Sequence, residues 1–228
     1  MRSLGTGFWV AVALAAVGFL VVPSLILQSP IEPNMGFVQK IFYFHVPCAI
    51  MMFLSTFVCA GGSIAYLFKG SERGDRLALA SAELGVLFGI CTLTTGPLWG
   101  RKAWGVWWQW DARLTTSLLL FLMLVAYLLA RRYGGPAGRK LAAALSLFAA
   151  INVPLVYKSV DIWRTVHPKT TVVTTLDTRM RVAFWCSFLL ITLVWAVLLI
   201  IRMRLERARA ELATLRLDAE DELAEGRP

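Results

Sequence analysis

Hydrophobic positions dominate this chain in six long runs, and polar positions gather in the stretches between them. A helix needs about 20 mainly apolar residues to cross a bilayer, and each run approaches or exceeds that length. The runs are residues 8–27, 41–68, 77–93, 115–130, 141–156 and 182–201. We therefore predict an all-α membrane protein, a bundle of six transmembrane helices, with residues 1–201 forming the membrane domain.

Composition supports this fold class, because 58% of the residues are hydrophobic and only 16% are charged. The first run follows Arg2, as the apolar core of a signal peptide would. It is longer than such a core, however, and no small-x-small cleavage pattern follows it. We expect a retained first helix.

Basic residues indicate the orientation, because they collect in cytoplasmic loops. They are frequent in segments 69–76 and 131–140 and directly after residue 201, which share one side of a six-span protein with the N-terminus. We expect both termini to be cytoplasmic. Segment 157–181, on the outer side, is also basic, and an anionic ligand would explain that. The net charge of +9 is split between two membrane faces, so nucleic-acid binding is excluded.

Residues 202–228 are predicted to form a charged cytoplasmic helical tail, which holds six basic and seven acidic residues. An apolar stripe runs along it through Leu205, Ala208, Leu212 and Leu215. The stripe is too short to indicate a coiled coil. The tail is either a solvated helix or a docking site for a cytoplasmic partner.

The four cysteines lie in or beside apolar runs, and no C-x-x-C or C-x-x-C-H pattern is present. The sequence therefore excludes the usual thiol oxidoreductase and covalent c-type haem attachment to this chain. We expect the cysteines to pack between helices. Cys48 keeps a possible further role, because it lies three residues after His45.

The most informative segment is a cluster of tryptophans between two apolar runs. Its members are Trp99, Trp104, Trp107, Trp108 and Trp110. Scattered tryptophans commonly anchor a chain at the membrane interface, but Trp104, Trp107 and Trp108 have helical spacing, and Asp111 continues the same face. We predict a flat aromatic shelf in a tryptophan-rich outer loop, with Asp111 and Arg113 at its end. A large planar ligand with its own charges suits such a shelf, and haem is the obvious candidate.

Two histidines, His45 and His167, are the only ones in the chain, and both map to the outer side. A single interfacial histidine is commonly just an amphipathic residue. Two of them beside a tryptophan shelf favour another interpretation, since neutral imidazoles bind haem iron from both faces. We predict that they are the axial ligands.

Haem propionates favour arginine, whose planar fork binds carboxylates with two hydrogen bonds. The outward basic candidates are Arg101, Lys102, Arg113 and Arg164. We expect Asp111 to cap a helix or pair with Arg113 rather than touch iron. Glu83, inside the third run, is either functional or, as we favour, structural. Asn152 with Pro154 predicts a kink whose polar groups are satisfied by neighbours, and Gly61, Gly62, Gly85 and Gly89 predict close helix contacts.

Several motifs together resemble a known family, and the resemblance covers nearly the whole chain. They are Phe44-His45-Val46-Pro47, the run from Thr95-Gly96-Pro97-Leu98-Trp99-Gly100 through Trp104 to Asp111-Ala112-Arg113-Leu114-Thr115, Asn152-Val153-Pro154, and Trp163 with His167. The chain resembles haem-handling protein C of the bacterial multi-component cytochrome c maturation system, within a tryptophan-rich haem-handling superfamily.

The resemblance implies a multi-pass protein of the bacterial inner membrane that holds non-covalent haem b at the periplasmic face between His45 and His167. It further implies delivery of this haem to a membrane-anchored haem chaperone, on which the haem becomes covalently attached. The implied partners also include the subunits of an ATP-binding-cassette (ABC) transporter and a small membrane subunit.

Two alternatives remain open: a transporter that moves haem across the membrane, and a cytochrome c synthase that acts directly on apocytochrome. A transporter needs polar or ligating groups along its spans, where only Glu83 qualifies. A synthase would need more spans or a large outer domain. The chain also lacks a Ser/His/Asp array and a phosphate-binding glycine loop. The sequence therefore favours a transfer protein over an enzyme.

Overall fold

The computed structural model describes residues 4–33, 35–168, 170–224 and 226. Across these ranges the chain is helical, with no strand beyond one isolated bridge between Glu32 and Gly36. The long helices are α1 (Thr6–Gln28), α2 (Phe42–Lys69), α3 (Glu72–Trp104), α4 (Ala112–Tyr133), α5 (Gly138–Ile162) and α6 (Thr178–Ala224). Three short 3₁₀ helices connect them: η1 (Phe37–Ile41), η2 (Gly135–Ala137) and η3 (Thr170–Thr175). All six long helices are apolar and long enough to cross a membrane, which confirms the predicted fold class.

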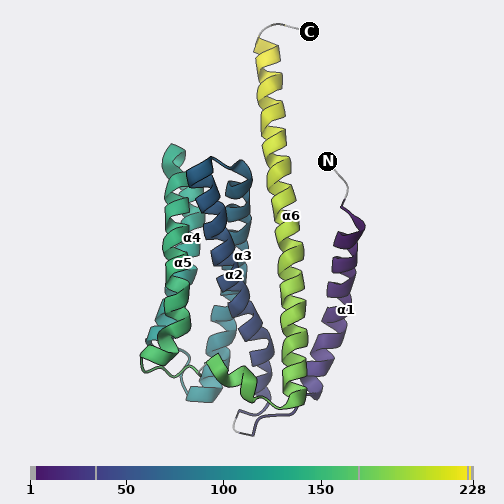
Figure 1. Ribbon diagram of the computed structural model, residues 1–228, viewed down its shortest axis with the longest axis vertical. Coiled ribbons are helices and arrows are strands. Elements are labelled where there is room, and N and C mark those ends of the chain that lie inside the picture. The colour runs from purple at the N-terminus through teal and green to yellow at the C-terminus, as the bar shows by residue number, and fades with distance from the viewer. Residues whose placement is uncertain (1–3, 34, 169, 225, 227–228) are drawn as a thin grey trace.

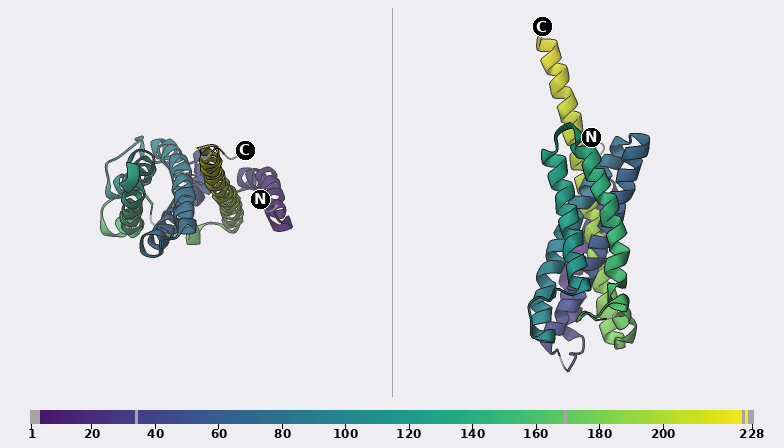
Figure 2. Two further views of the ribbon diagram at one scale, coloured as in Figure 1. Left: turned by 90° about the horizontal axis from the view of Figure 1, so that it is seen from above. Right: turned by 90° about the vertical axis from the view of Figure 1, so that its left-hand side faces the viewer.

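The bundle is arranged roughly as a row of helices (Figures 1 and 2). The α2–α3 and α4–α5 pairs pack as antiparallel neighbours, as their short connections predicted. Helix α6 contacts α2 and α3, and α1 packs against the opposite side of α6. Both termini lie at one end, here called the terminal end. The other end, here called the tryptophan end, carries segments 29–36, 105–111 and 163–177.

Helix α3 extends well beyond the predicted span of residues 77–93, so the outer loop that follows it is shorter than that span implies. Pro97 does not end the helix, because backbone groups freed by proline are satisfied by neighbours inside a bundle. The helix ends at Gly105, whose φ of 79° is the left-handed conformation that glycine adopts at helix ends. Helix α5 likewise continues to Ile162, beyond the predicted residue 156.

Helix α6 is attached to α2 by hydrogen bonds that follow from the sequence. Pro47 has no N–H to offer the carbonyl of Tyr43, one turn earlier in α2. The hydroxyl of Ser187 on α6 donates to that carbonyl instead. Deeper in the bundle, the indole of Trp195 donates to the Ser55 hydroxyl at 2.8 Å. These bonds fix α6 beside the start of α2.

Two polar side chains inside the spans, Glu83 and Asn152, have structural partners. Glu83 forms an ion pair with Arg202 of α6, with 2.6 Å between Oε1 and Nη2. This ion pair supports the structural interpretation of Glu83. The Asn152 side chain donates to the carbonyl of Thr116 on α4 at 3.0 Å, so the expectation of a satisfied amide is confirmed.

Helix α6 continues without a break into the charged tail and confirms that the tail is helical. Arg207 and Arg209 form ion pairs with Glu211 and Glu206 along the helix. The stripe residues Leu205, Leu212 and Leu215 are exposed. Figure 1 shows this part of α6 standing beyond the ends of the other helices.

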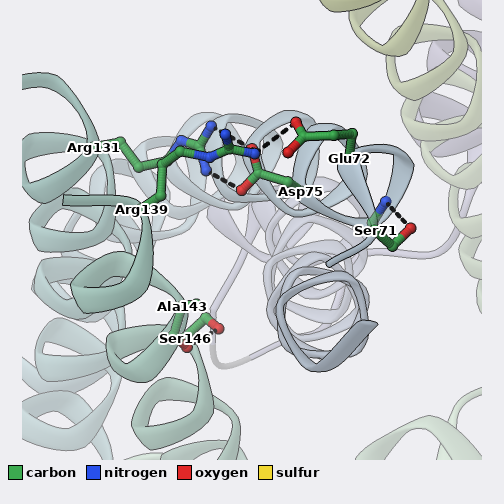
Figure 3. Close-up of polar contacts among 8 residues, drawn as sticks. Ser71, Glu72, Asp75, Arg131, Arg139, Ala143 and Ser146 are labelled. Carbon is green, nitrogen blue, oxygen red and sulfur yellow. Dashed lines mark hydrogen bonds and ion pairs between the residues drawn. The ribbon is translucent and has the colours of Figure 1, made fainter. Parts of the chain in front are cut away.

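A network of charges joins three helices at the terminal end (Figure 3). Arg131 of α4 binds Asp75 of α3 through both of its terminal nitrogens, at 2.9 Å for the Nη2–Oδ2 contact. Arg139 of α5 reaches the same carboxylate at 2.9 Å and Glu72 at 2.6 Å. The Arg139 guanidinium also lies 4.6 Å from the ring centre of Tyr66 on α2. The Asp75 side chain is only 7% exposed, so this is a buried ion pair.

Gly62 brings α2 and α3 into contact, and its neighbour Gly61 does not. A Cβ at Gly62 would lie 2.5 Å from the carbonyl oxygen of Gly74 and 2.8 Å from the nitrogen of Ala78, whereas a Cβ at Gly61 would meet nothing within 4 Å. Close packing is thus confirmed for Gly62 and wrong for Gly61. At Gly85 and Gly89 an added Cβ would meet side chains at 2.7 Å, as close packing requires.

Replacing Gly62 with alanine should destabilise the protein by about 1–3 kcal/mol, because backbone must move to admit the methyl group. Thermal unfolding of the detergent-purified protein, followed by tryptophan fluorescence, measures the effect. Gly61→Ala is the matched control and should leave the Tm unchanged. Equal Tm values for the two variants would show that contact at Gly62 does not limit helix packing.

Candidate functional site

A cavity of about 750 Å³ lies at the tryptophan end of the bundle. This volume falls within the roughly 300–1,000 Å³ typical of small-molecule sites. Its walls come from α2, α3, α4, α5 and α6 and from the segments that connect them. Of the predicted site residues, it is lined by His45, Trp99, Trp104, Trp107, Trp108, Arg113 and His167. Much of the remaining lining is apolar and includes Phe42, Phe53, Phe184 and Phe188.

His45 projects from the start of α2 toward α3 and is partly buried. Its Nδ1 lies 2.9 Å from the hydroxyl oxygen of Thr95 on α3. An added Cβ at the next residue, Gly96, would lie 3.2 Å from Cε1 of the imidazole. The α3 backbone therefore passes close to one edge of the His45 ring.

His167 lies in the segment between α5 and α6. Its Nδ1 is 2.9 Å from the carbonyl oxygen of Pro168, and its ring centre is 6.3 Å from that of Trp104. Burial, and after it the positive charge of Arg113, lowers the pKa of His167 to about 4. The imidazole is therefore neutral at pH 7. Because a carbonyl only accepts, Nδ1 carries the hydrogen and Nε2 keeps its lone pair.

Asp111 connects the start of α4 to the segment that carries His167. One carboxylate oxygen accepts from the backbone N–H of Leu114 at 2.8 Å and caps α4, as expected. The other accepts from the hydroxyl of Thr165 and, at 3.0 Å, from the N–H of Val166. The N–H of His167 in turn donates to Thr165 Oγ1 at 3.1 Å. The carboxylate thus positions His167 through one intervening side chain.

The predicted helical shelf is wrong, because residues 105–111 are not helical. Gly105 ends α3 directly after Trp104, and α4 begins only at Ala112. Trp107 and Trp108 reach the cavity from this irregular segment. The helical spacing of the tryptophans could not show that Gly105 ends the helix directly after Trp104.

The tryptophans nevertheless surround the cavity. The rings of Trp99 and Trp104 meet edge to face at 5.2 Å between centres. Trp110 is 75% exposed and lies outside the described lining of the cavity, edge-on to Trp108 at 5.7 Å. Among the described residues, the buried indole N–H groups of Trp99 and Trp108 have no hydrogen-bond partner. Buried donors of this kind favour a ligand with acceptor atoms.

The four basic residues that were predicted as propionate partners lie in different places. Arg113 is buried in the cavity wall and donates to the carbonyl of Val156 on α5. Arg101 donates to the carbonyl of Gly105, and both Arg101 and Lys102 are exposed beyond the described lining. Arg164 borders a second, more open cleft together with Asp111 and His167.

Some lining residues were not predicted from the sequence. They are Gln39 from η1 and Phe184, Trp185 and Phe188 from α6. Thr95 of α3, which contacts the lining residue His45, was not predicted either. For the α6 aromatics no signal was available, because they lie in a uniformly apolar run. Thr95 did carry a signal, since it is a hydroxyl in an apolar span just before a glycine and a proline.

These features define a class: a multi-pass membrane protein with an apolar cavity at one end, into which two imidazoles and several indoles project. Such a cavity suits a large, flat, amphipathic ligand that offers metal coordination. The sequence model of the family described as CcmC, heme exporter protein C, matches residues 2–222. The chain belongs to this family, whose members handle haem in cytochrome c maturation.

Individual relatives agree with this assignment. The heme exporter protein C of Bradyrhizobium diazoefficiens is 33% identical over 213 residues, which cover 90% of this chain and 81% of the relative. That of Escherichia coli (strain K12) is 33% identical over 186 residues, covering 77% of this chain and 73% of the relative. A mitochondrial protein of Marchantia polymorpha, named as ccmC-like and for cytochrome c biosynthesis, is 32% identical over 61% of this chain and 59% of its own length.

Proposed function

We propose that this protein binds haem b non-covalently at the tryptophan end and delivers it to a membrane-anchored haem chaperone. In this proposal His45 and His167 are the axial ligands of the iron. The observation that carries it is their convergence: two histidines far apart in the sequence line one cavity together with five tryptophans. Neutral imidazoles are the form that coordinates iron.

The cavity also matches the two chemical sides of haem. Its phenylalanine and tryptophan walls suit the apolar macrocycle, and a buried guanidinium suits a propionate. Arg113 is the favoured propionate partner, because it is the one of our four basic candidates that lines the main cavity. The unpartnered N–H groups of Trp99 and Trp108 supply further donors. Arg164, in the adjoining cleft, suits a propionate that extends toward solvent.

We further propose that the tryptophan end faces the periplasm and the terminal end the cytoplasm. Basic residues concentrate in the terminal-end connection between α2 and α3, in that between α4 and α5, and in the first turns after residue 201. In the inner membrane this distribution favours a cytoplasmic location for both termini. The cytoplasmic tail would then be the part available to ABC transporter subunits, with the small membrane subunit beside the spans.

Packing below the cavity favours one-sided binding over movement of haem across the membrane. A buried apolar cluster fills the bundle on the terminal side of the site, with members from α2, α3, α4, α5 and α6. It includes Met51, Leu84, Leu120, Val153 and Ile191. This packed apolar cluster offers no polar path to the charged propionates of a haem in transit.

The absorption spectrum of the detergent-purified protein tests haem binding. The wild type should retain haem with a six-coordinate, low-spin spectrum, and His45→Ala and His167→Ala should each lose that signature. Free imidazole should restore it by filling the space left by the missing ring, which serves as a control for correct folding. A wild-type spectrum in both variants would exclude the axial pair.

Delivery is tested by combining the haem-loaded protein with the chaperone in vesicles. Haem that stays on the chaperone through denaturing electrophoresis reports covalent transfer. We expect transfer from the wild type and little from either histidine variant. Transfer to apocytochrome without the chaperone would instead support the synthase alternative.

A further inference from the structure

The hydroxyl of Thr95 lies between two partners, and their chemistry decides which way its hydrogen points. Thr95 Oγ1 is 2.6 Å from the carbonyl oxygen of Cys91, one turn earlier in α3, and 2.9 Å from Nδ1 of His45. A hydroxyl has one hydrogen to donate. The carbonyl can only accept, so the hydrogen of Thr95 points to Cys91.

The contact with His45 must then run in the opposite direction. With its own hydrogen engaged, Thr95 Oγ1 can only accept, and Nδ1 of His45 donates. This contact therefore favours the tautomer in which Nδ1 of His45 carries the hydrogen and Nε2 keeps the lone pair.

Thr95 and its neighbour Gly96 on α3 also restrict the rotation of the His45 ring. Thr95 holds Nδ1 from one side, and the absence of a side chain at Gly96 lets Cε1 approach the helix closely. His167 makes the equivalent hydrogen bond by donating from Nδ1 to the main-chain carbonyl of Pro168, an acceptor that no substitution can remove directly. At His45 the acceptor is the side chain of Thr95, which a substitution can remove.

We propose that Thr95 is a positioning residue for haem, acting through His45. It fixes the tautomer and ring orientation that leave Nε2 free for iron. By accepting from Nδ1–H it also makes Nε2 a stronger electron donor to the iron. Hydrogen-bond partners of ligating histidines act in this way, and their loss typically weakens metal binding about 10–100-fold. This inference rests on the proposed function, since it requires His45 to be a ligand.

The test compares three variants of the full-length, detergent-purified protein by haem titration and electron paramagnetic resonance. Thr95→Val keeps the shape of the side chain but removes the acceptor, and it should weaken haem retention about 10–100-fold and shift the low-spin signal. Thr95→Ser keeps the hydroxyl and should behave as the wild type. Thr56→Val is the matched control: Thr56 is a fully buried threonine on α2 whose hydroxyl donates to the carbonyl of Met52.

A double variant separates a positioning role from a merely structural one. In the His45→Ala background, adding Thr95→Val should change haem affinity no further, because the ring through which it acts is gone. Wild-type affinity and an unshifted signal in Thr95→Val, with His45→Ala defective, would overturn the inference alone. Wild-type behaviour of His45→Ala would overturn the proposed function itself. Additive losses in the double variant would show that Thr95 acts through general packing, which also contradicts the inference.

Discussion

Asparagine in place of Asp111 should weaken haem retention at least about tenfold and reduce the low-spin signal. The carboxylate accepts from three donors, one at the cap of α4 and two in the segment of His167. An amide has one oxygen and one NH₂ group, so it cannot face both sets as an acceptor. Hydrogen bonds to charged groups contribute about 1.5–3 kcal/mol each, and about 1.4 kcal/mol corresponds to a tenfold change in affinity. Haem titration with absorption spectroscopy measures the loss.

Asp177→Asn is the matched control for this variant. Asp177 is another aspartate at the tryptophan end; it is exposed and accepts from the backbone N–H of Arg179 at the start of α6. Asparagine caps a helix about as well as aspartate, so haem binding should stay unchanged. Equal haem affinity in Asp111→Asn and Asp177→Asn would mean that the His167 segment does not depend on the Asp111 carboxylate.

Removal of the buried carboxylate at the other end should instead destabilise the fold and leave the haem spectrum intact. Asp75→Ala leaves Arg131 without its two-point partner and Arg139 without one of its two carboxylates. Breaking a buried ion pair from one side costs about 3–5 kcal/mol, because the remaining charge is uncompensated. Unfolding in a sodium dodecyl sulfate titration, followed by circular dichroism, measures this free energy.

Glu72→Ala provides the comparison within the same network. Glu72 also binds Arg139, but its side chain is 61% exposed, and exposed ion pairs contribute about 0–1 kcal/mol. We therefore expect a much smaller loss than for Asp75→Ala. Similar losses in both variants would indicate that burial of Asp75 does not strengthen the network.

The sequence predicted the number and type of helices well, because the bilayer imposes a simple requirement of length and apolarity. It predicted their ends less well. Helix α3 passes through Pro97, Arg101 and Lys102 before it ends at Gly105, and a window of apolar residues stops before all of them. The helix ends where the backbone adopts a left-handed conformation, and the one sequence signal for that conformation is Gly105 itself.

Within the site, residue type could be predicted, but its contacts often could not. His45 and His167 were identifiable as the only two histidines, and their convergence confirms that they lie at the same end of the bundle. The contact between Thr95 and His45 joins residues 50 positions apart, and the one between Asp111 and Thr165 joins residues 54 positions apart. No local pattern encodes such pairs, because they arise only when the helices pack.

The length of α6 has an electrostatic consequence for the tail. At about 1.5 Å per residue, Asp218 stands roughly 24 Å and Glu222 roughly 30 Å beyond Arg202 along the helix axis. Electrostatic interactions with headgroups fade within about 8 Å at physiological salt. Arg202, Arg204, Arg207 and Arg209 come first after the span, within reach of anionic lipids, whereas the acidic cluster of Asp218, Glu220, Asp221 and Glu222 comes last. The anionic membrane surface therefore attracts the basic first part of the tail helix. The acidic last part lies too far from that surface to be repelled by it, so the helix can project from the membrane into solution.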